Sequence, residues 1–283
     1  MERIAVGVDG SEAADRALQW AVAEAELHGA AIDLVHVYVI HPYASMFGDT
    51  DRTLAEARLD AVVDRNRGLL DRVRWSSTMV DAAGAAAGAL IDAAVGADLL
   101  VVGSRGAGGF PHLALGSTAY RTAAHAPAPV AVVRSDERTT DGARPLVVGI
   151  DDAPVSRRAL RWALEEAERR ATSVTVVHSY LLPVDLAPAA VLDQRRFTRA
   201  RAQARDAAGA LVDRVVGAAR IPAGVEVDRI IEAGPPAGAL LDHAKGRLLV
   251  VGTRGQGTFS RAIFGSVSQQ VLHHADHSVV VVP

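Results

Sequence analysis

Two stretches of this sequence place glycines at one fixed spacing after an apolar run. The first is VVGSRGAGGFPHLALGS, from Val101 to Ser117, and the second is VVGTRGQGTFSRAIFGS, from Val250 to Ser266. Both follow the pattern G-x2-G-x9-G-S. Glycine lets a backbone turn sharply and approach an anion, and the amides that begin a following helix are hydrogen-bond donors. The pattern therefore indicates a phosphate cradle, with simple turn formation as the alternative for either loop.

Two familiar phosphate motifs do not match these loops. A P-loop needs Gly-Lys followed by Ser or Thr, and the single lysine of the chain, Lys245, lies outside both loops. A dinucleotide fingerprint needs G-x-G-x-x-G on the first strand, where this sequence has VGVDGS and VGIDDA. The loops therefore predict a phosphate site of another kind.

The elements around the loops occur twice, because the chain is a tandem repeat. The segment VGVDGSEAADRALQWA from Val6 aligns with VGIDDAPVSRRALRWA from Val148, and DLVHVY aligns with TVVHSY. Near the glycine loops the offset changes, because Asp98 has no counterpart in the second copy. The period is too long for a solenoid, so each copy is a domain. We place the domains at residues 1–138 and 145–283, joined by the polar segment RSDERTTDGARP.

Within each copy, short apolar runs alternate with segments of helical periodicity. IAVGV is a buried strand, SEAADRALQWAVAEAELHG is an amphipathic helix that stops at Gly29, and AIDLVHVYV is the next strand. Five strands alternating with helices predict an α/β fold, a doubly wound, five-stranded parallel sheet in each domain. In such sheets ligands bind beyond the carboxyl ends of the strands, where the glycine loops begin.

The composition sets limits on the partners. The chain has 283 residues, 49% of them hydrophobic and 22% charged, which is typical of a soluble globular protein. The net charge of −3 gives no overall attraction to nucleic acid or anionic membranes, and the absence of cysteine fits a reducing compartment. Charged residues and glycines interrupt the Ala-rich stretch from Asp81 to Gly103, so no membrane span is expected. We expect a cytoplasmic homodimer with no nucleic-acid partner.

The glycine spacing, an aspartate ending the first strand and VH in the second strand resemble the universal stress proteins, in their ATP-binding branch. The resemblance occurs once in each copy of the repeat and so covers nearly the whole chain. The chain is similar to the tandem-domain form that is common in actinobacteria. The resemblance implies the strand order 3-2-1-4-5, which would bring Asp9 opposite Gly103 across the cleft. It also implies ATP as the ligand, with Mg²⁺ held through the phosphates. The first copy departs from the family at DAAGAAAGAL, where a Gly-x-Pro turn is common.

The resemblance also implies which residues form the two sites. The adenosine pockets would be lined by Gly7, Asp9 and Val37 in the first copy and by Gly149, Asp151 and Ser179 in the second. The triphosphate would be held in the first copy by Gly103, Ser104, Arg105, Gly106, Gly108, Gly116, Ser117 and Thr118. The second copy matches these with Gly252, Thr253, Arg254, Gly255, Gly257, Gly265, Ser266 and Val267.

These residues favour a regulator that signals by nucleotide occupancy, with one ATP per domain and no catalytic residues. A slow ATPase or autokinase is the alternative, in which Arg105 and Arg254 stabilise transferred charge. A third alternative is an interaction protein whose loops bind nothing. The sequence does not identify the stress signal or the protein partner.

Other residues have simpler interpretations. Asp9 alone could only cap a turn, and His36 and His178 are expected to be core histidines rather than metal ligands. The HADH segment and the arginines of RRFTRARAQAR are expected to be solvated, with a metal and an acidic or nucleic-acid partner as the alternatives. Asp152 adds a carboxylate beside the second cleft, where it either repels a triphosphate or caps the next helix.

Overall fold

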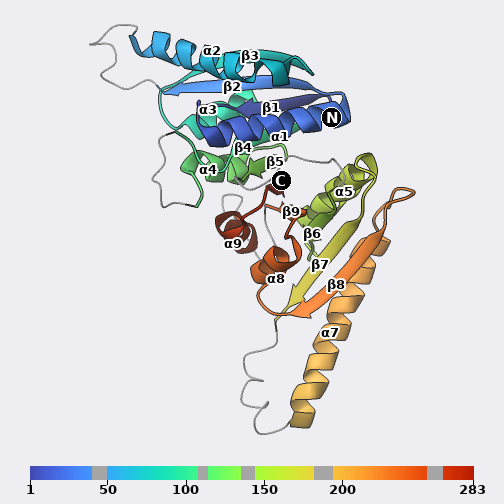
Figure 1. Cartoon of the computed structure of the whole chain (residues 1–283). Coiled ribbons are helices and arrows are strands. Elements are labelled where there is room, and N and C mark those ends of the chain that lie inside the picture. The colour runs from blue at the N-terminus through green and yellow to red at the C-terminus, as the bar shows by residue number, and fades with distance from the viewer. Residues whose placement is uncertain (40–49, 108–113, 135–143, 182–193, 254–263) are drawn as a thin grey trace. The chain divides into compact units, whose positions relative to one another are not determined.

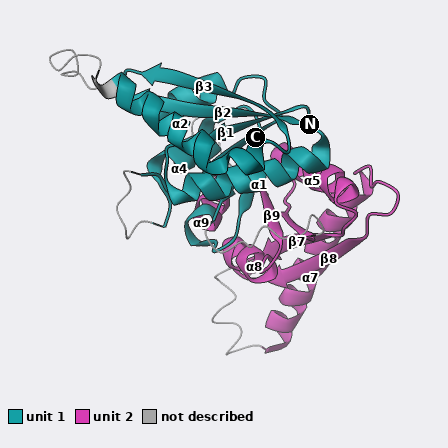
Figure 2. Ribbon diagram, turned by 45° about the horizontal axis from the view of Figure 1, so that its top comes forward, with its two compact units in different colours: residues 1–142, 272–281, 283 teal, residues 143–271, 282 magenta. Residues whose placement is uncertain are grey.

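The structure is a computed structural model that describes residues 1–39, 50–107, 114–134, 144–181, 194–253 and 264–283. Its internal contacts divide the chain into two compact units (Figure 2). The first unit contains residues 1–142, 272–281 and 283, and the second contains residues 143–271 and 282. The two units follow the two copies of the repeat except near the carboxyl end of the chain.

The first unit alternates strands and helices as the sequence predicts (Figure 1). Its strands are β1 (Arg3–Gly7), β2 (Ala31–Val39), β3 (Arg74–Ala82), β4 (Leu99–Gly103) and β5 (Val130–Val133). Its helices are α1 (Glu12–His28), α2 (Thr50–Leu70), α3 (Ala86–Ala93) and α4 (Ser117–His125). These strands lie in the order β3-β2-β1-β4-β5 with parallel pairing, which confirms the predicted order 3-2-1-4-5.

Helices cover both faces of this sheet. Helices α1 and α2 pack against each other, as do α3 and α4. α1 lies on β1, β4 and β5, whereas α3 lies on β2 and β3. The central strands are apolar without alternation, and Ile4, Ala5 and Val6 of β1 are fully buried. Continuous apolar strands are expected where helices cover a parallel sheet on both sides.

The second unit repeats this arrangement. Its strands are β6 (Leu146–Gly149), β7 (Val174–Tyr180), β8 (Val227–Ala233) and β9 (Leu248–Gly252), in the parallel order β9-β6-β7-β8. This order corresponds to 4-1-2-3 of the prediction. The helices are α5 (Pro154–Arg169), α7 (Gln194–Gly217), α8 (Pro236–His243) and α9 (Ser266–His274), the last of which continues into the first unit.

The last strand, β10 (Val279–Val282), departs from the all-parallel pattern. It belongs to the second copy in sequence, but most of it groups with the first unit and pairs antiparallel with β5, with Val280 opposite Ala131. The physical reason is that β5 would otherwise end the sheet of the first unit with unpaired backbone groups, which an additional strand can satisfy. The sequence analysis did not predict this pairing.

The first helix of each copy begins by a different local device. In α1, the Ser11 hydroxyl accepts a hydrogen bond of 3.2 Å from the Ala14 amide. Helix α5 has Ala153 at that position and no side-chain cap, but the Ser156 hydroxyl donates to the carbonyls of Asp151 and Ala153. The two hydroxyls therefore act differently, because Ser11 accepts from an amide at the start of α1, whereas Ser156 donates to carbonyls just before α5.

Asp98, which has no counterpart in the second copy, holds the amino end of β1. Its carboxylate accepts hydrogen bonds from the amides of Glu2 (2.5 Å) and Arg3 (3.1 Å). The bond from the Glu2 amide is the main reason that the pKa of Asp98 lies below its ordinary value of 3.8. Hydrogen bonds to a carboxylate favour its charged form.

We predict that Asp98→Asn makes the protein less sensitive to acid. Because the folded pKa is depressed, the stabilisation by Asp98 is present above the unfolded pKa and is lost as the pH falls through the folded pKa. The free energy of unfolding, measured by urea titration from pH 7 down to pH 3, should therefore fall less steeply below about pH 4 in the variant than in the wild type. Parallel pH profiles for the two proteins would contradict this role.

Candidate functional site

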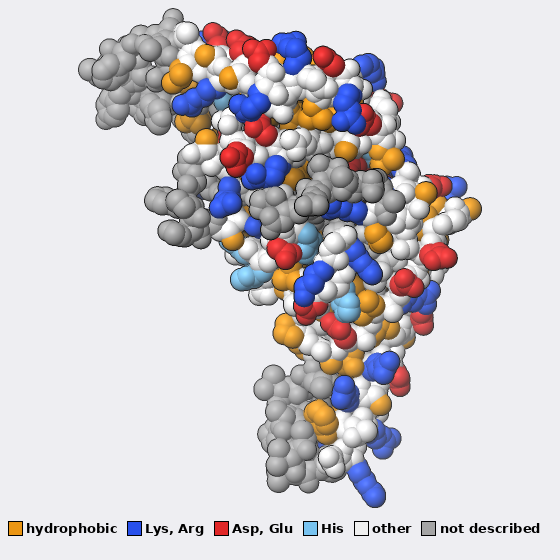
Figure 3. Space-filling model, in the orientation of Figure 1, with side chains coloured by type: hydrophobic (Ala, Val, Ile, Leu, Met, Phe, Trp, Pro, Cys, Tyr) orange, Lys and Arg blue, Asp and Glu red, His pale blue; other side chains and the backbone are white. Residues whose placement is uncertain are grey.

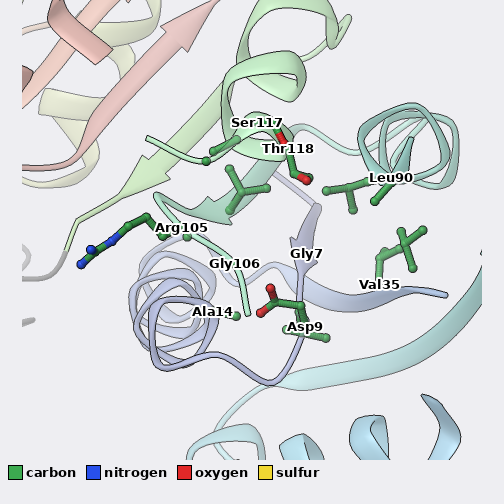
Figure 4. A pocket seen from close by; sticks show the side chains of 16 residues that line it. Gly7, Asp9, Ala14, Val35, Leu90, Arg105, Gly106, Ser117 and Thr118 are labelled. Carbon is green, nitrogen blue, oxygen red and sulfur yellow. The ribbon is translucent and has the colours of Figure 1, made fainter. Parts of the chain in front are cut away.

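The first unit contains a cavity of about 300 Å³ beyond the carboxyl ends of β1, β2 and β4 (Figure 4). It lies where the chain connections diverge, because β1 pairs with β2 on one side and with β4 on the other. The sequence-predicted residues that line it are Gly7, Asp9, Val37, Gly103, Arg105, Gly106, Gly116, Ser117 and Thr118. Ser104 is buried behind the cavity, and Gly108 lies outside the described residues.

The sequence analysis missed most of the apolar wall of this cavity. Val8, Ala14, Val35, Ala86, Leu90, Val102 and Ala119 also line it. The segment GAL that ends at Leu90 occurs again at residues 238–240, and this repetition was a signal that could have identified the position. One half of the cavity is therefore aliphatic, and the other half is formed by the glycine loop and the start of α4 (Figure 4).

The second strand fixes the end of the first strand, and so the position of Asp9. The Val8 amide donates to the Val35 carbonyl at 2.9 Å, and His36 Nδ1 donates to the Val8 carbonyl at 2.8 Å. The second copy repeats both bonds at Ile150, which donates to Val177 at 3.0 Å and accepts from His178 Nδ1 at 2.8 Å. This confirms that the two histidines are hydrogen-bonded structural residues.

The carboxylate of Asp9 connects the end of β1 to the glycine loop. Oδ1 accepts a hydrogen bond from the Ser11 amide at 3.0 Å, and Oδ2 accepts one from the Ala107 amide at 2.7 Å. A Cβ atom on Gly106 would lie only 2.5 Å from Oδ2. Asp9 therefore faces the glycine loop at Gly106 and Ala107, whereas the predicted position opposite Gly103 stays a prediction. Its hydrogen bond with the Ser11 amide also forms the local turn that the simpler interpretation of Asp9 predicted.

Two backbone hydrogen bonds close each glycine loop. The Ser104 amide donates to the Val133 carbonyl at 2.9 Å, and the Gly116 amide donates to the Ser104 carbonyl at 2.8 Å. The second copy has the same two bonds, from Thr253 to Val282 at 2.9 Å and from Gly265 to Thr253 at 2.7 Å. The two ends of each loop are therefore held together at Ser104 and at Thr253.

The start of α4 supplies hydrogen-bond donors to the cavity. Gly116 is the N-cap and offers no capping side chain, so the first amides of the helix have no intrahelical partners. The side chains of Ser117 and Thr118 are exposed and line the cavity. A helix amino end with free amides and hydroxyls favours an anionic ligand.

Arg105 lies at the edge of this site. Its side chain leads away from Asp9 and Thr118 in Figure 4, although backbone atoms of the residue border the loop. Stabilisation of transferred charge by Arg105, which the enzyme alternative requires, would therefore need another side-chain conformation.

Four glycines at strand ends lie close to residues of the packed helices. A Cβ atom on Gly103 would lie 2.6 Å from the backbone carbonyl atoms of Ala13 in α1. On Gly7 it would lie 2.9 Å from Leu90, and on Gly149 it would lie 2.9 Å from Leu240. Gly252 has the same constraint against Val155, also at 2.9 Å. At Gly103 the close atoms are backbone, so this position needs glycine whether or not a phosphate binds, whereas at the other three the closest atoms are side-chain methyl groups that can shift.

The second copy places its predicted residues at the matching strand ends. The Asp151 carboxylate accepts a hydrogen bond from the Ala153 amide at 2.9 Å, and the Ser179 hydroxyl donates to the Gly234 carbonyl. Ser266 and Val267 begin α9, so Val267 replaces the hydroxyl of Thr118 with an apolar side chain. Arg254, Gly255 and Gly257 lie outside the described residues.

Asp152 forms ion pairs with two arginines. Its carboxylate is 2.6 Å from Arg157 and 3.0 Å from Arg214, and the hydrogen bond from Arg157 is the main cause that lowers its pKa. It does not cap α5, whose N-cap Ala153 has no side-chain bond. Asp152 is therefore paired with two positive charges, and the suggested repulsion of a triphosphate stays a prediction.

The remaining candidate residues lie outside the cavity. Helix α9 ends at His274, the first residue of the HADH segment, and both His274 and the preceding His273 are exposed. His277 is buried and contacts Asp276, so the expectation that the whole segment is solvated was wrong for this residue. The arginine-rich segment forms the amino-terminal half of α7, where Arg195 and Arg199 are exposed, and Figure 3 shows basic side chains along this part of the surface. Within the described residues, no helix is both long and apolar enough to cross a membrane.

The fold and the cleft define a class of protein: tandem doubly wound α/β domains with a cavity at the switch point of the first sheet. Comparison with known proteins identifies the family. The model of the universal stress protein family matches residues 1–134 and 142–283. The chain belongs to this family, as the resemblance in the sequence suggested.

Relatives in mycobacteria and solved structures agree with this assignment. A universal stress protein of Mycolicibacterium smegmatis is 33% identical over 99% of this chain and 96% of its own length. Universal stress protein Rv2005c of Mycobacterium tuberculosis is 29% identical over 98% of this chain and 96% of its own length. The crystal structure of a universal stress protein from Archaeoglobus fulgidus shares the fold, with a TM-score of 0.72 and 20% identity, and the match covers 99% of this chain and 97% of that one.

Proposed function

We propose that this universal stress protein binds ATP, one molecule in each domain, and regulates a stress or growth response according to nucleotide occupancy. The observation that carries the proposal is the two-part cavity of the first domain. Its aliphatic half suits a base and a sugar, and its other half offers loop amides and the free amides of a helix start to phosphates. The preference for adenine follows from the family resemblance.

The residues present fit such a ligand. Val35, Val37 and Leu90 would contact the adenosine, and Asp9 lies between them and the loop. The amides near Gly106 and the hydroxyls of Ser117 and Thr118 would hold the phosphates. Mg²⁺ would be held through those phosphates and would offset their repulsion with the Asp9 carboxylate.

Occupancy rather than turnover is the proposed signal. Nothing in the described part of the cavity combines a general base with a group that positions a water or an acceptor, and the Arg105 side chain leads away from it. We therefore expect ATP hydrolysis, if measured, to be slower than about 1 per second, the lower end of ordinary enzymes.

The proposal predicts two adenine nucleotides per chain. Denaturing the purified protein and identifying the released small molecule by mass spectrometry should give ATP or ADP. Calorimetric titration of nucleotide-stripped protein with ATP and Mg²⁺ should then saturate near two molecules per chain, and phosphate release in the same sample should stay slow. Release of NAD, or no heat of binding with ATP, would overturn the proposal, and fast phosphate release would favour the ATPase alternative.

A further inference from the structure

The two glycine loops share their backbone closure but are braced by different side chains. In the first domain, the residue after the closing carbonyl of Val133 is Arg134. In the second domain, the matching carbonyl is that of Val282, and the residue after it is Pro283, which has no donor. The side chain at this position can therefore support the first loop only.

Arg134 holds the carboxyl end of the first loop. Its Nη1 donates to the Ala114 carbonyl at 2.5 Å, two residues before the N-cap Gly116, and its Nη2 donates to the Leu272 carbonyl. Arg134 is buried, with only 8% of its surface exposed. Burial, and then the charge of Arg105, lower the pKa of Arg134.

A buried guanidinium at this place has an energetic cost. Desolvation of a charge is expensive, and an apolar side chain of similar volume often gives equal or higher stability. Nη1 and Nη2 of Arg134 donate to backbone carbonyls, one of which belongs to the loop itself, whereas its buried Nε has no hydrogen-bond partner among the described residues. Its contribution is therefore to fix the path of the loop into α4, where the proposed phosphate donors lie.

The second domain braces its loop from the helix instead. Ser268, in the first turn of α9, is 4% exposed, and its hydroxyl donates to the carbonyl of Gly252, the first glycine of the loop. The matching residue of α4 is Ala119, which has no hydroxyl. Within the described residues, each copy therefore has one brace that the other lacks.

We infer that Arg134 and Ser268 are positioning residues, Arg134 for the phosphate subsite of the first domain and Ser268 for that of the second. This rests on the proposed function, because the subsites are those of the proposed nucleotide. A loop that is held in place needs less ordering when a ligand binds, so loss of a brace weakens the contacts that the loop makes. Affinity for the triphosphate can then be changed in one domain at a time.

The test compares ATP with adenosine, which lacks the groups that the loops hold. Arg134→Met should weaken ATP at the first site about tenfold, which corresponds to about 1.4 kcal/mol, and should leave adenosine within about twofold. Arg134→Lys retains the positive charge but has a single donor nitrogen, so its ATP affinity at the first site should lie between those of Arg134→Met and the wild type. Ser268→Ala should weaken ATP at the second site and leave the first unchanged. Calorimetry in Gly255→Ala and Gly106→Ala backgrounds isolates the first and the second site, respectively.

The outcomes separate this inference from the proposed function. If ATP and adenosine weaken together, or if each substitution affects both sites, the residues have only a general structural role and the inference is wrong. Amide hydrogen exchange of the ligand-free protein gives a second readout: Arg134→Met should accelerate exchange at Gly116 but not at Gly265, and Ser268→Ala the reverse. Failure of wild-type protein to bind ATP would overturn the proposed function, whereas unchanged exchange would overturn the braces even if ATP binds.

Discussion

Gly103→Ala should lower the free energy of unfolding by about 3 kcal/mol, the upper part of the range for overpacked positions. A Cβ atom at this position would lie 2.6 Å from both C and O of Ala13 and 3.0 Å from the Ala14 amide nitrogen. These atoms belong to the backbone of α1, so no side-chain rotation relieves the clash. The end of β4 or the start of α1 must shift, and both positions border the cavity. Urea unfolding monitored by circular dichroism measures the loss.

Two other glycines provide matched controls for this prediction. Gly252→Ala meets mainly the side chain of Val155, at 2.9 Å, which can rotate, so we expect a loss of about 1 kcal/mol. Gly88→Ala meets nothing within 4 Å and lies in helix α3, so it should stabilise the protein by roughly 0.5 kcal/mol. If Gly103→Ala and Gly88→Ala have similar stabilities, the packing explanation for the strand-end glycine is wrong.

Gly106→Ala should have the opposite profile, a small effect on stability and a large effect on binding. The new Cβ would lie 2.5 Å from Oδ2 of Asp9, which is the end of a side chain and can move. Movement of the Asp9 side chain breaks its 2.7 Å hydrogen bond with the Ala107 amide. The substitution also adds a methyl group beside the proposed phosphate path. We expect ATP affinity at the first site to fall at least tenfold, about 1.4 kcal/mol, and the calorimetric stoichiometry to approach one per chain.

A double-substitution cycle tests whether Asp9 mediates this effect. If the clash with Asp9 is the cause, Gly106→Ala should weaken ATP less in an Asp9→Ala background than in the wild type, because the carboxylate is absent. Equal losses in both backgrounds would assign the effect to the methyl group alone. Two fully retained sites in Gly106→Ala would show that the glycine loop of the first domain is only a turn.

Much of the fold could be predicted from the sequence because its signals are local and occur twice. Apolar runs such as IAVGV predicted strands, the periodicity up to Gly29 predicted α1, and the repeat predicted two similar domains. The glycine spacing located the loops, and the strand order that the family resemblance implied placed Asp9 beside the first of them. These patterns depend on residues that are close in the chain, so they are visible without coordinates.

The tertiary structure alone decided which distant residues complete and support the site. Leu90 reaches the cavity from α3, and Ala13 is the reason that Gly103 must be glycine. Arg134 donates a hydrogen bond to the carbonyl of Ala114, 20 residues earlier in the chain. The carboxylate of Asp152 accepts one from Arg214, 62 residues later. Only folding brings such partners together, because their contacts depend on how helices pack on the sheet. The sequence therefore determined the type of fold and the place of the cleft, and packing between distant segments decided the wall, the braces and the charge balance around it.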